Sequence, residues 1–142
     1  MKKITVLIAA CLALGLSLKA QCGKNIKWTS SKTQFLDTAG SFQHENDEAV
    51  DITTTPSKIS IVRHGEEEHH MEGDITDLTC KWTDKQNGKT TFKTLLLDPD
   101  ENKTRHDTIT IEAVNGKTTF MLRAEEELTI IKLNIDSFEE VK

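Results

Sequence analysis

Histidine and acidic side chains crowd the segment from residue 64 to residue 72, where their types could do chemistry together. Imidazole and carboxylate groups bind Zn, Cu or Ni when three or four of them converge from a fixed framework. The segment follows an expected strand and contains Gly65, so we interpret it as a solvated acidic loop, with specific metal binding as the alternative. The candidate ligands for that alternative are His64, Glu66, Glu68, His69 and His70.

A second group of oxygen-bearing residues, Asp98-Pro99-Asp100-Glu101-Asn102, resembles the opening of a calcium-binding loop. The pattern then fails, because Lys103 stands where such a loop requires glycine and Ile109 stands where it requires glutamate. A Pro-Asp turn between two strands accounts for these residues. We therefore expect no calcium here, and no cofactor elsewhere.

Motifs of nucleophilic catalysis are missing from the sequence. No serine lies in a Gly-x-Ser-x-Gly turn, and Cys80 is expected to point into the core beside Trp82 rather than toward a histidine. Asp and Glu residues number 23, which makes any single pair of carboxylates uninformative about glycoside hydrolysis. We predict that the protein is not an enzyme.

Residues 1–20 have the form of a cleavable export signal. Met1-Lys2-Lys3 supplies the positive start, and the apolar run from Ile4 to Leu18 is too short to cross a bilayer. Cleavage after Ala20 would make Gln21 the new N-terminus. We expect a signal-peptide helix that is removed, and a secreted or periplasmic protein without a transmembrane span.

A competing cleavage site lies inside this signal. Ile8-Ala9-Ala10-Cys11 has the spacing of a lipobox, which would make Cys11 a lipid-bearing N-terminus. Apolar residues continue past Cys11 to Leu18, where a lipoprotein usually becomes polar. Lipid anchoring through Cys11 is therefore the minor alternative.

The mature chain, residues 21–142, is long enough for a single domain with one core. Without Lys2, Lys3 and Lys19 the 18 basic residues fall to 15 against 23 acidic ones, and the net charge moves from −5 to −8. Binding to nucleic acid or to anionic membranes requires clustered Lys and Arg, which this chain lacks. The partner is instead expected to be a protein or a small apolar ligand.

Two cysteines, Cys22 and Cys80, remain after cleavage. Export would place them in an oxidising compartment, where thiols form disulfides. We predict that they pair and tie the N-terminus to a strand in the middle of the chain. The alternative is a buried free thiol at Cys80, with Cys22 in a flexible tail.

Alternation of apolar and polar residues with period two recurs along the chain, which predicts an all-β protein. The clearest strand is 107–114, and Asn115-Gly116 then favours a type I′ hairpin turn into a strand at 118–124. Asn87-Gly88 is expected to form a similar turn, within a motif (Asn-Gly-Lys-Thr-Thr-Phe) that recurs at 115–120. Further strands are expected around Trp28 and around Leu78, Cys80 and Trp82, and at 50–55, 58–63, 90–97 and 129–138, with a long loop from Leu36 to Glu48.

Seven or eight strands joined mostly by short turns predict an antiparallel meander that closes into a small β-barrel, with a β-sandwich as the alternative. An exported chain with Trp28 in its first strand and hairpins after it resembles the lipocalin and calycin-like barrels and small exported proteins of bacterial envelopes. Those barrels carry Gly-x-Trp in the first strand, whereas this chain has Ile26 two residues before Trp28. The resemblance implies an apolar ligand inside the barrel, in a pocket lined by Trp28, Trp82, Ile109, Ile111, Phe120 and Ile131.

Two principal functions therefore follow from the sequence. The first is a non-enzymatic binding module of the cell envelope or extracellular space, which engages a partner through an exposed face. The alternative is a carrier that encloses a small apolar ligand, and metal binding by the segment from His64 to His70 is the third. An enclosed cavity of about 300 Å³ or more would favour the carrier.

Overall fold

The computed structural model describes residues 21–65 and 67–142, which form strands and turns and no helix. The expected signal peptide, the alternative lipid site at Cys11 and the candidate ligand Glu66 lie outside the described residues. The strands are β1 (Ile26–Ser30), β2 (Thr33–Leu36), β3 (Phe42–Asn46), β4 (Ala49–Thr54), β5 (Lys58–His64), β6 (Glu68–Asp84), β7 (Asn87–Asp98), β8 (Lys103–Val114), β9 (Lys117–Ala124), β10 (Ile130–Asn134) and β11 (Ser137–Glu140).

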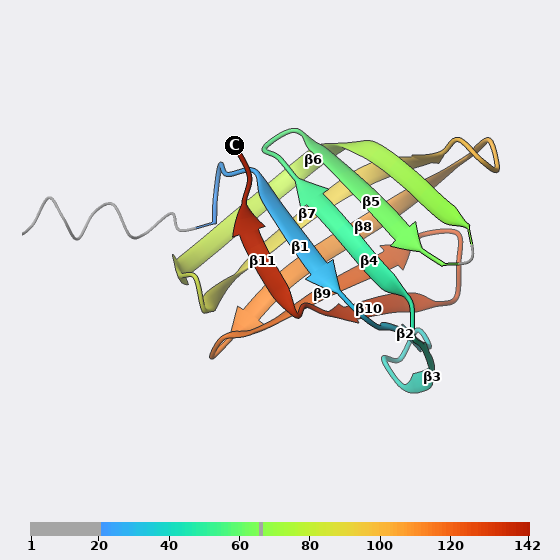
Figure 1. Cartoon of the computed structure of the whole chain (residues 1–142), viewed down its shortest axis with the longest axis horizontal. Coiled ribbons are helices and arrows are strands. Elements are labelled where there is room, and N and C mark those ends of the chain that lie inside the picture. The colour runs from blue at the N-terminus through green and yellow to red at the C-terminus, as the bar shows by residue number, and fades with distance from the viewer. Residues whose placement is uncertain (1–20, 66) are drawn as a thin grey trace, which may run out of the picture.

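All eleven strands belong to one antiparallel sheet, in the order β11-β1-β4-β5-β6-β7-β8-β9-β10-β2-β3. The all-β prediction is therefore confirmed, and the single sheet excludes a sandwich of two sheets. The order ends at β11 and β3, so the sheet is not the closed barrel that the sequence led us to expect. Figure 1 shows that it curls strongly, with β1, β4 and β11 crossing in front of β7 and β8.

The sheet has more strands than expected because β2 and β3 were not predicted and the predicted strand at 129–138 is divided. At three places a short gap separates two strands that follow each other in the chain. Each gap is two residues long, and the gaps separate β1 from β2, β3 from β4, and β10 from β11. Between β10 and β11 the Asp136 N–H donates to the Thr29 carbonyl oxygen at 2.8 Å. Its carboxylate in turn accepts a hydrogen bond from the Ser31 N–H at 2.7 Å. The predicted strand at 129–138 is therefore two strands, and the hydrogen bonds of Asp136 fix the two-residue connection between them.

The expected loop from Leu36 to Glu48 contains strand β3, and this prediction was wrong. All five residues of β3 are exposed, so the segment shows none of the alternation by which a half-buried strand is recognised. β3 pairs with β2, and the rings of Phe35 and His44 stack with their centroids 4.4 Å apart. Pairing with a neighbour, rather than burial, holds this strand in place.

The two Asn-Gly pairs have different roles. Asn115 and Gly116 have φ values of 51° and 81°, which confirms the predicted hairpin turn. Asn87 and Gly88 instead lie within β7, opposite Asp84 and Trp82, and the turn falls just before them at residues 85–86. A Cβ atom at Gly88 would overlap the Trp82 indole, so the lack of a side chain at this position allows the indole to pack against the backbone. The repeated motif thus begins with a turn in the copy at 115–120 and lies wholly within a strand in the copy at 87–92.

Buried apolar side chains from most of the strands meet in one cluster inside the curled sheet. Trp28 lies within it, and its indole Nε1 donates to Thr54 Oγ1 at 3.0 Å. Its ring centroid is 5.2 Å from that of Phe138 and 6.5 Å from that of Trp82. Cys80 packs against the same cluster, which confirms that Cys80 and Trp82 share the inward face.

Candidate functional site

The six residues proposed to line a ligand pocket belong to the packed interior. Ile131 is partly buried, and the other five are at most 4% exposed. The cavity that touches Trp28 and Ile111 has a volume of about 40 Å³, which is room for roughly one water molecule. Pockets for small organic ligands have volumes of about 300–1,000 Å³. These side chains therefore fill the space that a carrier would keep open.

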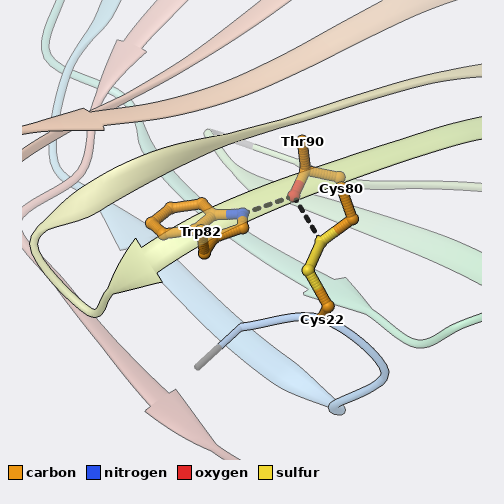
Figure 2. Close-up of a disulfide and its surroundings, with 4 residues drawn as sticks. All are labelled: Cys22, Cys80, Trp82 and Thr90. Carbon is orange, nitrogen blue, oxygen red and sulfur yellow. Dashed lines mark hydrogen bonds between the residues drawn. A yellow bond between two sulfur atoms is a disulfide. The ribbon is translucent and has the colours of Figure 1, made fainter. Parts of the chain in front are cut away.

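Cys22 and Cys80 form a disulfide, which confirms the predicted pairing. Figure 2 shows the bond together with Trp82 and Thr90. The Thr90 hydroxyl oxygen accepts a hydrogen bond from Trp82 Nε1 at 2.7 Å and lies 3.4 Å from Cys80 Sγ. The disulfide thus ties the segment that precedes β1 to a fixed position on β6.

Four of the candidate metal ligands, His64, Glu68, His69 and His70, are strand residues, so the expected loop is limited to the tip of the hairpin between β5 and β6. His64 ends β5 opposite Glu68 of β6, and Arg63 pairs with His69. Because side chains alternate along a strand, His69 lies on the opposite face from Glu68 and His70. The sheet therefore separates residues that the sequence places next to one another.

Two of these imidazoles already lie close to carboxylate groups. His64 Nε2 lies 2.9 Å from an oxygen of Asp51, and its Nδ1 lies 3.6 Å from an oxygen of Glu68. His69 Nδ1 lies 3.6 Å from Asp100. Residues 21–65 and 67–142 contain no group of three or more His, Cys, Asp or Glu side chains placed to hold a metal ion. Asp98 of the apparent calcium motif accepts the Asp100 N–H at 3.0 Å within its own turn.

A buried ion pair at the start of β8 was missed from the sequence. Asp107 is 2% exposed, and its Oδ2 accepts a hydrogen bond from Arg105 Nε at 3.0 Å. Arg105 Nη1 also lies 3.5 Å from Glu127, whereas Arg105 Nη2 and Asp107 Oδ1 have no hydrogen-bond partner among the described residues. Burial raises the pKa of the Asp107 carboxyl, although the Arg105 guanidinium opposes this. Asp107 shares the inward face of β8 with Ile109 and Ile111. This alternation in the sequence could have indicated that Asp107 is buried.

A recess of about 210 Å³ opens beside this ion pair. Arg105, Met71 and Leu96 line it, together with several carboxylates that include Glu126 and Glu127. Arg105 and the carboxylates that line the recess could hold water or one small polar group.

The outer face of the sheet carries a larger groove. It has a volume of about 400 Å³ and crosses β4, β5, β6 and β7. Leu95 and Leu97 lie two residues apart on the outward face of β7 and are 47% and 40% exposed. A Cβ atom at Gly73 would overlap Thr94 Oγ1, so this glycine lets β7 approach β6 closely. We call this surface the leucine groove, and its lining also includes Lys58, Ile59, Glu72 and Asp74.

No family model matches this chain, and no curated protein or solved structure shows significant similarity to it. Across residues 21–65 and 67–142, the structure contains no helix with the length and apolar character needed to cross a membrane.

Proposed function

We propose that this chain is an exported, non-enzymatic binding module that engages a partner protein through the leucine groove. The observation that carries the proposal is the pair of exposed leucines, Leu95 and Leu97, beside a groove of about 400 Å³. Adjacent exposed apolar side chains with polar residues around them are typical of protein interaction surfaces.

The packed interior favours this surface over an internal ligand. A carrier must keep a cavity large enough for its ligand, and the space beside Trp28 and Ile111 holds about 40 Å³. Phe92, Ile109 and Phe120 are at most 1% exposed, so they contact protein atoms on all sides. Opening a pocket among them would remove packing that stabilises the domain.

Charge around the groove restricts the partner. Lys58 of β5 lies opposite Asp74 of β6 in the strand register, and Glu72 lies two residues from Asp74 on the same strand. A complementary surface would offer an apolar centre, a basic group facing the two carboxylates and an acidic group facing Lys58. The acidity of the whole mature chain further favours a partner with net positive charge.

Export is part of the same proposal. Residues 1–20 have the pattern of a signal peptide, and the Cys22–Cys80 disulfide is the kind of bond that persists in secreted and periplasmic proteins. Cleavage after Ala20 would leave this disulfide at the N-terminal edge of the mature domain. The binding module would then act in the periplasm or outside the cell.

Photo-crosslinking in the exporting cell tests the groove directly. A benzoylphenylalanine at position 97 should give an adduct of defined mass, and Leu95→Ser should lower its yield about tenfold, as expected for a central interface residue. The matched control is the same probe at Val114, the last residue of β8, which is 55% exposed. Leu97 pairs with Thr104 near the start of β8, so the two probe sites lie at opposite ends of this strand. Equal adducts at 97 and 114, or none at 97, would contradict the proposal.

Native mass spectrometry of the exported protein separates the module from the carrier. We expect the mass of the polypeptide alone. A small apolar molecule that is retained in stoichiometric amount would overturn the assignment in favour of a carrier.

A further inference from the structure

Gln21 has a buried side-chain amide. The residue is 8% exposed, and its Nε2 forms no hydrogen bond within the part of the chain that the structure describes. Buried polar groups are nearly always hydrogen-bonded, so an amide donor in this state requires an explanation. The same residue would become the chain terminus if the export signal is cut after Ala20.

The cavity around Gln21 offers no counter-charge for a terminal ammonium group. Among residues 21–65 and 67–142, the lining contains no Asp or Glu, and the charged residue in it is the basic Lys24. Apolar side chains such as Ile75 and Leu78 provide most of the remaining wall. A terminal amine is protonated below its usual pKa of about 7.7, and an unpaired buried charge is strongly unfavourable.

The adjacent disulfide keeps this terminus at the cavity. Gln21 is joined directly to Cys22, whose Cα lies 5.9 Å from that of Cys80 across the disulfide. Figure 2 shows the disulfide joining the segment before β1 to the strand that carries Cys80 and Trp82. The disulfide therefore holds Gln21 within one residue of a fixed position on β6.

We infer that Gln21 is a modification site at which the mature N-terminus closes to pyroglutamate, an inference that rests on the export proposed above. The freed α-amino nitrogen attacks the side-chain carbonyl carbon Cδ, and a bond forms between them. The bond from Cδ to Nε2 breaks, and Nε2 takes up the proton that the attacking nitrogen loses and leaves as ammonia. The reaction needs neither oxidant nor reductant. The product loses both the terminal charge and the unpartnered Nε2.

Mass spectrometry of the protein purified from its exporting host tests this modification. The N-terminal peptide should begin at residue 21 and be lighter by one ammonia than the peptide with free glutamine. It should resist Edman degradation until a pyroglutamyl aminopeptidase is added. An isotopically labelled synthetic peptide with free Gln21, carried through the same preparation, measures any closure that occurs during handling.

The outcomes separate this inference from the proposed function. A mature chain that begins with unmodified Gln21 overturns the modification and leaves export intact. A chain that begins at any other residue overturns both the modification and the cleavage site. Closure no greater than that of the labelled peptide also overturns the modification.

A variant that cannot cyclise tests the physical cause. Gln21→Ala retains a free terminal amine at the cavity, where burial should depress the amine's pKa. The denaturation midpoint of this variant should therefore fall, relative to the wild type, as the pH is lowered from about 9 to about 6, because the amine must then be charged in the unfolded chain. Parallel pH profiles for the two proteins would contradict the argument from the buried charge.

Discussion

Replacing both Cys22 and Cys80 with alanine removes the bond that holds the N-terminal segment against β6. The two residues are 58 apart in the sequence, so the disulfide closes a long loop in the unfolded chain. In the chain-entropy model a loop of that length contributes about 4 kcal/mol to the free energy of unfolding. For a domain of this size, a loss of about 4 kcal/mol lowers Tm by about 15 °C.

Urea unfolding followed by tryptophan fluorescence measures this loss, because Trp28 and Trp82 are both buried and become exposed on unfolding. Three samples are compared: the oxidised wild type, the wild type with reductant, and the double variant. The last two should have the same free energy of unfolding, and reductant should not change the variant.

The result that would refute the reasoning is a loss below about 1 kcal/mol in both the reduced wild type and the variant. Such a result would have one of two meanings. Without the disulfide, the N-terminal segment either stays close to β6 in the unfolded ensemble or detaches from β6 in the native state. Hydrogen exchange at Ile26 and Trp28 distinguishes these cases, because only detachment in the native state would expose the amides of β1 to exchange.

Two further predictions concern single side chains. Gly73→Ala should lower the free energy of unfolding by about 1–3 kcal/mol in a denaturant titration, because the new methyl group overlaps Thr94. Gly65→Ala is the control, since its Cβ would have its nearest contact at an ordinary 3.7 Å; equal losses in the two variants would contradict the crowding argument. The hydrogen bond and charge of Glu126 raise the pKa of His106, so an NMR titration should give it a midpoint above its ordinary value, and Glu126→Gln should lower it. Because the folded-state pKa is raised, the stabilisation from this pair is present at low pH and is lost as the pH rises through that pKa; an unchanged midpoint in the variant would exclude Glu126 as the cause.

Several features were predictable because they depend on a few neighbouring residues. The alternation from 107 to 114 is a local pattern, and β8 includes that whole range. Asn115 and Gly116 tolerate positive φ, and the turn they form depends on little else. The pairing of Cys22 with Cys80 was argued from the chemistry of the compartment and was confirmed.

Other features depend on residues that are distant in the sequence. The glycine at 88 looks like a turn residue locally, but its neighbour in space is Trp82, whose ring fills the place of a side chain. Strand β3 has no buried face, so only its pairing with β2 reveals it. Asp107 was visible as an acid at the start of a strand, but its burial beside Arg105 depends on how the sheet curls.

The sequence by itself determined the all-β class, most of the strands, one hairpin turn and the two cysteines available to pair, because alternation and turn chemistry are properties of short segments. Only the tertiary structure decided that the interior is packed, that the histidines alternate between two faces, and that Leu95 and Leu97 border a groove. These outcomes depend on the curvature and register of the sheet. Curvature and register arise from contacts between strands far apart in the chain, which no local pattern contains.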